Sequence, residues 1–232
     1  MARRCVAALA VLSILTLSAC TTAVDGAPRG RGAAPRPAAL RCTQPETTAE
    51  IECLRTSLSR FWTDALGRRV DLRTVYAPRP DQVPRNCRSA LRLNTAFSCP
   101  VDDTVYLTAG FVRTTRSAGA AAQAWIRLAT TMGHEMGHIV QFVERAPLAV
   151  KSQNTPAESR QVEQQADCLA GVWSASVGID TTQFLDANSL VLAVLDTRWE
   201  RVTHGAPAER LAAVRRGQHG RAAASCGLTV RR

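Results

Sequence analysis

A short stretch near the middle of the chain places two histidines and a glutamate at a spacing suited to metal chemistry, His134-Glu135-Met136-Gly137-His138. The surrounding residues predict a helix, and residues four apart lie on one helix face. His134 and His138 can therefore reach a single tetrahedral zinc ion. Glu135 can act from beside the metal's open side as the general base that takes a proton from zinc-bound water. The alternative is a helix whose two histidines serve packing or bind water.

A second segment offers the third protein ligand that a catalytic zinc site needs beside its open position. Glu163 lies 25 residues beyond His138, in another predicted helix. Asp167 lies four residues further on the same face and precedes an apolar run, Cys168–Trp173, at whose edge a carboxylate needs a partner. We expect Glu163 to bind the metal and Asp167 to hold the Nδ1–H of His134. The alternative is an ordinary solvated helix face.

The N-terminal residues have the pattern of an export signal. Arg3 and Arg4 precede an apolar stretch, Val6 to Leu17, that is too short to span a membrane stably. The sequence then reads Leu17-Ser18-Ala19-Cys20, which resembles the lipobox of bacterial lipoproteins. Residues 1–19 are therefore expected to be a lipoprotein signal peptide, and Cys20 to be lipidated.

This interpretation divides the chain into three parts: a signal peptide, a tether and one domain. After the signal peptide, residues 20–41 are rich in proline, glycine and arginine and predict a flexible tether. Residues 42–232 are long enough for one domain with a hydrophobic core. The lipid on Cys20 would anchor this domain to the outer face of the bacterial cell membrane. Cleavage without lipidation would leave a secreted protein instead.

The charge of the chain is strongly positive without a nucleic-acid pattern. The net charge is +10, aromatic residues make up 5%, and the basic residues are scattered arginines apart from Lys151. A nucleic-acid-binding protein would show a basic stripe with interleaved aromatics. We therefore expect attraction to an anionic envelope rather than nucleic-acid binding. The oligomeric state stays open.

The cysteines agree with export. Six remain after Cys5 in the signal and Cys20, and an even number outside the cytosol indicates three disulfides. Fifteen pairings are possible. Closure of short loops favours Cys42–Cys53 and Cys87–Cys99, which leaves Cys168–Cys226. A cysteine-rich zinc site is the rival interpretation, but the chain contains no C-x-x-C spacing.

The elements that must position these residues form a mostly helical α+β domain, with a small sheet before the metal-binding helix. Periodicity and turn residues predict helices at 47–66, 118–143, 156–176, 181–195 and 207–216, and strands at 70–76 and 104–108. The second strand is either an edge strand that could pair with an extended peptide or an ordinary core strand. Gly133 and Gly137 weaken the metal-binding helix, which is tolerable where another backbone approaches closely.

Two segments of the chain resemble signatures of the neutral zinc metallopeptidase family of bacteria. They are His134-Glu135-Met136-Gly137-His138-Ile139-Val140-Gln141 and Glu163-Gln164-Gln165-Ala166-Asp167-Cys168-Leu169-Ala170-Gly171-Val172-Trp173. Weaker similarity occurs at residues 99–107 and at Thr203-His204-Gly205. The resemblance implies a zincin-like α+β fold and a thermolysin-type site. In that site His134, His138 and Glu163 bind Zn²⁺, and Glu135 is the base. Asp167 does not touch the metal but orients one of its histidine ligands.

These residues together predict a zinc metallopeptidase that hydrolyses a peptide or protein substrate with a Glu-activated, zinc-bound water. His204 is the candidate for stabilising the oxyanion, because it is a spare histidine in a family-like segment. It could instead be a surface histidine in a loop. Two other functions stay open: a non-catalytic, zinc-stabilised binding or scaffold lipoprotein, and an amidase acting on peptidoglycan stem peptides.

Overall fold

The computed structural model describes residues 42, 46–92, 94–117, 121–150, 155–184 and 198–231. The predicted signal peptide 1–19, the predicted lipidation at Cys20 and the predicted tether 20–41 fall outside these residues. The predicted helix 181–195 lies outside them from residue 185 onward. The described residues belong to one compact unit, which is mostly helical and has a small sheet, so the predicted α+β class is confirmed.

The first helix, α1, spans Thr47–Leu66, the range predicted from the sequence. Its apolar residues recur three or four positions apart, and this spacing places them on one buried stripe. Leu54, Leu58 and Trp62 are fully buried. The helix ends at Gly67, whose φ of 65° is left-handed, a conformation that glycine adopts without steric cost.

Three short strands form one sheet, and its strand order is β1-β3-β2. They are β1 (Arg73–Tyr76), β2 (Ala96–Cys99) and β3 (Thr104–Leu107). In the parallel pair Arg73 lies opposite Thr104, and in the antiparallel pair Ala96 lies opposite Leu107. All four residues of β3 are buried.

The central position of β3 decides between the two interpretations of this segment. It is a core strand with a neighbour on each side, so the edge-strand alternative for 104–108 is wrong. The edges are β1, which is shorter than the predicted 70–76, and β2, which was not predicted. Four-residue strands carry too short a period-2 pattern to be identified securely from sequence.

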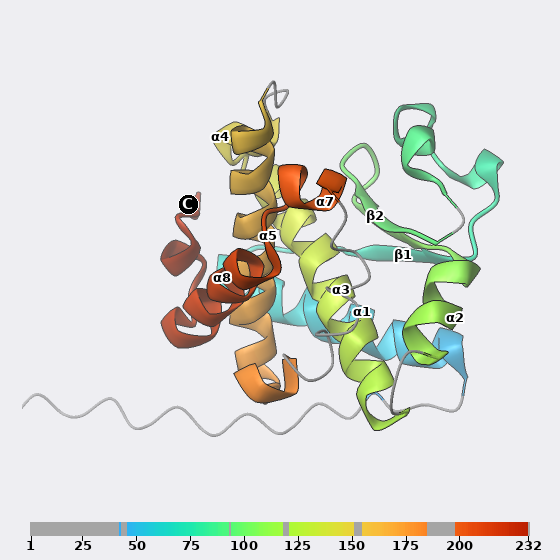
Figure 1. Ribbon diagram of the computed structural model, residues 1–232, viewed down its shortest axis with the longest axis horizontal. Helices are drawn as coiled ribbons and strands as arrows, with labels where there is room; N and C mark the ends of the chain where they lie inside the picture. Colours follow the sequence, from blue (N-terminus) through green and yellow to red (C-terminus); the bar gives the residue numbers. More distant parts are fainter. Residues whose placement is uncertain are drawn as a thin grey trace, which may run out of the picture. The chain divides into compact units, whose positions relative to one another are not determined.

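The helix that carries the H-E-x-x-H segment is α3 (Ala121–Val143), which ends where the predicted helix 118–143 ends; residues 118–120 lie outside the described residues. A second helix, α2 (Ala109–Ser117), was not predicted. The shorter α2 has its own apolar face, with Val112 buried. In Figure 1, α3 passes between the sheet on one side and α5 and α8 on the other.

The remaining helices complete the other side of α3. They are α4 (Pro147–Val150), α5 (Pro156–Ser176), α7 (Arg198–Thr203) and α8 (Pro207–Gly220). The bounds of α5 agree with the predicted 156–176, and α8 runs four residues beyond the predicted end. The start of α5 is a capping box, because Thr155 accepts from the Glu158 backbone and the Glu158 side chain accepts in return. Pro156 occupies the first helical turn, where its missing N–H costs nothing.

Glycines allow α3, α5 and α8 to pack backbone to backbone. A Cβ at Gly137 of α3 would lie 2.8 Å from the carbonyl oxygen of Ala166 in α5, so the predicted close approach of another backbone occurs there. Gly133 instead faces the ring of Trp173, a side chain. On the other side of α5, a Cβ at Gly217 of α8 would overlap the carbonyl oxygen of Cys168. The contacts of Gly133 and Gly137 set the distance between α3 and α5, the two helices that carry the candidate metal ligands.

Three disulfides are present: Cys42–Cys53 and Cys87–Cys99, the pairs favoured by closure of short loops, and Cys168–Cys226, the pair that these two leave. The first ties the chain before α1 to that helix. The second links the 3₁₀ turn Arg85–Ala90 to β2. The third connects α5 to the C-terminal 3₁₀ turn Ala223–Cys226. Within the described part of the chain, no helix has the length and apolar character needed to cross a membrane.

Candidate metal centre

Three donor atoms from α3 and α5 meet at one point. The Nε2 atoms of His134 and His138 are 3.2 Å apart, and Oε2 of Glu163 lies 3.1 Å from the first and 3.2 Å from the second. The two rings are nearly perpendicular. The side chains are 11–19% exposed. The i, i+4 spacing on α3 places the two imidazoles together, and the packing of α5 brings the carboxylate to them.

On the side of the ring away from the cluster, the Nδ1 atom of His134 forms a hydrogen bond with a side chain of α5. It lies 2.8 Å from Oδ1 of Asp167. Arg210 of α8 donates from Nε and Nη2 to the two oxygens of the same carboxylate, at 2.9 and 3.0 Å. Because the ionised Asp167 can only accept, the Nδ1 of His134 carries a proton, and the neutral form of the ring, which is the form that binds a metal, has its lone pair on Nε2, directed at the cluster.

His138 is oriented by a side chain of its own helix. Its Nδ1 lies 2.9 Å from Oε1 of Gln141, whose amide nitrogen donates to the carbonyl oxygen of Val162 at 2.8 Å. The amide oxygen can only accept, so the Nδ1 of His138 also carries the proton. In their neutral form both histidines therefore turn an Nε2 lone pair toward Glu163.

This arrangement fits a zinc ion. With both imidazoles neutral, two lone pairs and a carboxylate oxygen in mutual contact are three acceptors without a donor, and a metal cation between them satisfies all three. The separations of 3.1–3.2 Å are near the edge of a tetrahedron with bonds of about 2.0–2.1 Å, which is roughly 3.3 Å. Two histidines and one carboxylate are also the donor set of a known class of catalytic zinc sites.

The charges around the cluster favour positive charge at this point. Burial by itself lowers the pKa of His134, but Asp167 and Glu163 outweigh it and raise the pKa to about 10. The pKa of His138 is raised too, because Glu163 overcomes the effect of burial. Burial would raise the pKa of Asp167, yet Arg210 and His134 hold it well below its usual range. The same balance lowers the pKa of Glu163, through its two histidine neighbours. Both carboxylates are thus ionised, as metal binding requires.

Glu135 and His204, the two predicted catalytic residues, differ in their contacts. Glu135 is buried, its charge favours the protonated form of His138, and among the described residues none forms a hydrogen bond or ion pair with its carboxylate. His204 has its Nε2 3.2 Å from Oε2 of Glu163 and its Nδ1 2.8 Å from the Thr203 hydroxyl. His204 is not part of the group of mutually close donors formed by His134, His138 and Glu163.

The structure thus brings the predicted ligands His134, His138 and Glu163, the supporting Asp167 and His204 to one place. Gln141 and Arg210 were not predicted from the sequence to take part in the site. Gln141 lies three residues after His138 on the same helix face, and this spacing was an available signal. Arg210 is 43 residues from Asp167, and no local pattern links residues that far apart.

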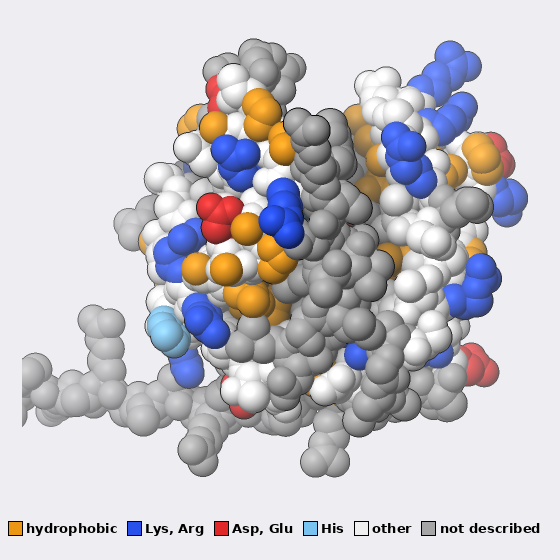
Figure 2. All heavy atoms as spheres, viewed as in Figure 1, with side chains coloured by type: hydrophobic (Ala, Val, Ile, Leu, Met, Phe, Trp, Pro, Cys, Tyr) orange, Lys and Arg blue, Asp and Glu red, His pale blue; other side chains and the backbone are white. Residues whose placement is uncertain are grey.

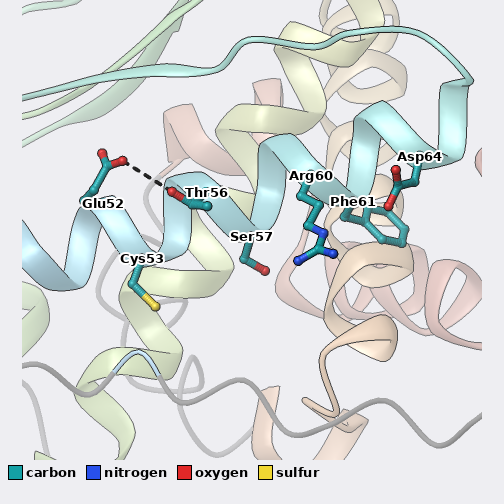
Figure 3. Close-up of a pocket in the computed structure, with 7 residues that line it drawn as sticks. All are labelled: Glu52, Cys53, Thr56, Ser57, Arg60, Phe61 and Asp64. Atoms are coloured by element: carbon teal, nitrogen blue, oxygen red, sulfur yellow. Dashed lines mark hydrogen bonds between the residues drawn. The ribbon is translucent and has the colours of Figure 1, made fainter.

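A separate hollow runs along one face of α1, away from this chemistry (Figure 3). Its lining residues come from this single helix, and a hydrogen bond joins Thr56 to Glu52; they are Glu52, Cys53, Thr56, Ser57, Arg60, Phe61 and Asp64. The lining includes no histidine and no residue of the donor cluster. Figure 2 shows arginine side chains, in blue, scattered over the visible face of the molecule.

Comparisons with known proteins agree with the donor set. The family model described as "Putative neutral zinc metallopeptidase" matches residues 80–228. Two curated relatives are "Uncharacterized protein YpfJ" of Escherichia coli strain K12 and the protein of the same name from Escherichia coli O6:H1 strain CFT073. Each is 29% identical over 134 residues, which cover 51% of this chain and 45% of the relative. The chain thus spans about half the length of these relatives. No solved structure matches the chain significantly.

Proposed function

The chain belongs to the neutral zinc metallopeptidase family, and we propose that it hydrolyses peptide bonds at a zinc ion held by His134, His138 and Glu163. The observation that carries the proposal is the convergence of their three donor atoms within 3.1–3.2 Å of one another. Three protein ligands leave one position for water and substrate, which distinguishes a catalytic zinc site from a closed structural one.

Each residue of the site has a defined task in this proposal. Zinc held there supplies Lewis acidity, which eases deprotonation of water and polarises the scissile carbonyl. Glu135 would accept a proton of the attacking water and deliver it to the leaving amine, so that water and amide become a carboxylate and an ammonium group. Its carboxylate is suited to this role, since among the described residues it has no hydrogen-bond or ion-pair partner.

His204 is proposed to stabilise the negative oxygen of the tetrahedral intermediate. Oε2 of the ionised Glu163 can only accept, so the Nε2 of His204 at 3.2 Å must carry the proton. Its Nδ1 then accepts from the Thr203 hydroxyl. His204 therefore presents an N–H donor at the rim of the cluster, which is the group an oxyanion requires.

We also propose that the domain acts outside the cytosol, anchored through a lipid on Cys20. The support comes from the sequence, which has an apolar signal segment followed by Leu17-Ser18-Ala19-Cys20. The three disulfides are compatible with an oxidising compartment. The substrate would then be a peptide or protein of the cell envelope or its surroundings.

The test is metal analysis and hydrolysis by the purified wild-type protein. We expect one zinc per chain, cleavage of a casein-type substrate, loss of cleavage with a chelator and recovery when zinc is restored. Purified peptidoglycan is digested in parallel. Cleavage of stem peptides without cleavage of protein would replace the peptidase by an envelope amidase. Zinc binding without hydrolysis of protein, peptidoglycan or a peptide library would leave a scaffold lipoprotein.

His204→Ala should reduce turnover by about 10²–10³-fold, the usual cost of removing one oxyanion donor. The zinc content should stay at the wild-type level, because His204 lies outside the group of mutually close donors. His219→Ala is the matched control, since this exposed histidine of α8 lies outside the cluster. Wild-type turnover in His204→Ala would refute the role, and loss of zinc would make His204 a ligand.

A further inference from the structure

Gln141 has only one amide orientation that satisfies its neighbours. Its side chain is fully buried. The amide nitrogen donates to the carbonyl oxygen of Val162 at 2.8 Å and to Oε1 of Gln165 at 3.0 Å. The Val162 carbonyl can only accept, so a flipped amide would place an oxygen against it and lose a buried hydrogen bond. The oxygen of Gln141 must therefore face His138, where it accepts from Nδ1.

The same reasoning continues one residue further, to Gln165. Its Nε2 donates to the backbone carbonyl oxygen of Cys226 at 3.0 Å, an atom that can only accept. The Oε1 of Gln165 is thereby turned toward the amide of Gln141. A chain of hydrogen bonds thus runs from the Cys226 carbonyl through Gln165 and Gln141 to His138.

The residue at which this series of hydrogen bonds begins, Cys226, is held by a covalent bond. Cys226 is joined to Cys168, which directly follows Asp167 in α5. Asp167 holds the Nδ1 of His134, and the Cys226 carbonyl leads to the Nδ1 of His138. One disulfide therefore lies next to the supports of both imidazoles.

We infer that the Cys168–Cys226 disulfide is a positioning element of the zinc site, acting on His138 through Gln165 and Gln141. It holds the 3₁₀ turn Ala223–Cys226 against α5, so that the Cys226 carbonyl stays within reach of Gln165. Without it only noncovalent contacts hold the turn to α5. The Cys226 carbonyl is then less firmly placed for Gln165, and His138 is less firmly oriented.

This inference rests on the proposed function and adds a regulation to it. The protein reaches its full affinity for zinc only after the Cys168–Cys226 disulfide has formed. In a reducing compartment the peptidase would hold its metal weakly and stay inactive. The other two disulfides have no such role. Among the described residues, no hydrogen bond of Cys42, Cys53, Cys87 or Cys99 leads to the donor cluster.

Paired alanine variants of the full chain test the inference. Alanine is used because free thiols would themselves bind zinc. Cys168→Ala with Cys226→Ala should weaken zinc binding about 10–100-fold, the usual cost of losing an outer support of a ligand. Cys87→Ala with Cys99→Ala is the matched control and should bind zinc like the wild type. The measurement is competition with a chromogenic chelator.

A second readout separates positioning from a general loss of stability. The visible absorption of the Co²⁺-loaded protein reports ligand geometry, and it should change for the Cys168/Cys226 pair and not for the Cys87/Cys99 pair. Gln165→Met, with all disulfides intact, should weaken zinc binding by a similar factor. Adding Gln165→Met to the Cys168/Cys226 pair should cause little further loss of zinc affinity, because both changes interrupt the same series of hydrogen bonds to His138.

The outcomes separate the inference from the proposed function. Equal zinc affinity of the two cysteine pairs, or full additivity with Gln165→Met, would overturn the inference while the peptidase stands. A wild-type protein that binds no zinc would overturn the proposed function itself. If the Cys168/Cys226 variant does not fold, Gln165→Met alone decides, and wild-type affinity and Co²⁺ absorption in that variant would refute the positioning role.

Discussion

Glu135→Gln should lower kcat/KM for peptide hydrolysis by about 10²–10⁴-fold, the range that general-base catalysis contributes. The amide has nearly the same shape as the carboxylate but cannot accept the proton of the attacking water. The zinc content should not change, because the donor cluster consists of His134, His138 and Glu163. The measurement is steady-state hydrolysis of a protein substrate beside metal analysis of the same sample.

Glu135→Asp provides the matched comparison. It keeps a carboxylate one methylene further from the water, so part of the activity should remain. Wild-type turnover in Glu135→Gln would remove Glu135 from the mechanism. Loss of zinc in that variant would show instead that Glu135 supports the metal, a role for which its contacts give no reason.

Glu163→Ala should weaken zinc binding by more than about 100-fold, since even the outer partners of a ligand are worth 10–100-fold. It removes one of the three converging donor atoms and also the carboxylate that lies against both histidines. Hydrolysis should disappear with the metal. The measurement is zinc content after dialysis and zinc affinity by competition with a chelator.

The control for Glu163→Ala is Glu52→Ala, which removes one carboxylate from an exposed position on α1. It should bind zinc and cleave substrate like the wild type. If Glu163→Ala retains zinc with wild-type affinity, the third ligand has been assigned wrongly. The hydrolase proposal would then lose the geometry on which it depends.

Part of the fold could be predicted because its signals are local. The 47–66 and 156–176 helices were predicted with the bounds of α1 and α5, since periodic apolar residues and a proline at the first turn mark them. The end of α3 at Val143 was also predicted, whereas α2 and β2 were missed. Short elements carry too few residues for a clear period, and tertiary contacts decide whether they form.

The candidate site divides in the same way. The separation of His134 and His138 along one helix predicted that their rings could meet, because helix geometry fixes the distance between i and i+4. Asp167 was expected to hold His134, and it lies 2.8 Å from that ring. The support of His138 by Gln141 and of Asp167 by Arg210 was not foreseen. The second of these contacts depends on how α8 packs against α5.

The sequence by itself determined the kind of chemistry that this chain can offer, because residue type and helical spacing are local properties. Two imidazoles, a carboxylate base and a distant acid were readable from it. Only the tertiary structure decided that the carboxylate of Glu163 reaches the histidines and that the 3₁₀ turn Ala223–Cys226 reaches Gln165. Contacts between separate elements depend on close backbone packing, as at Gly137 against Ala166, and packing of this kind is set by the whole domain and not by any one segment.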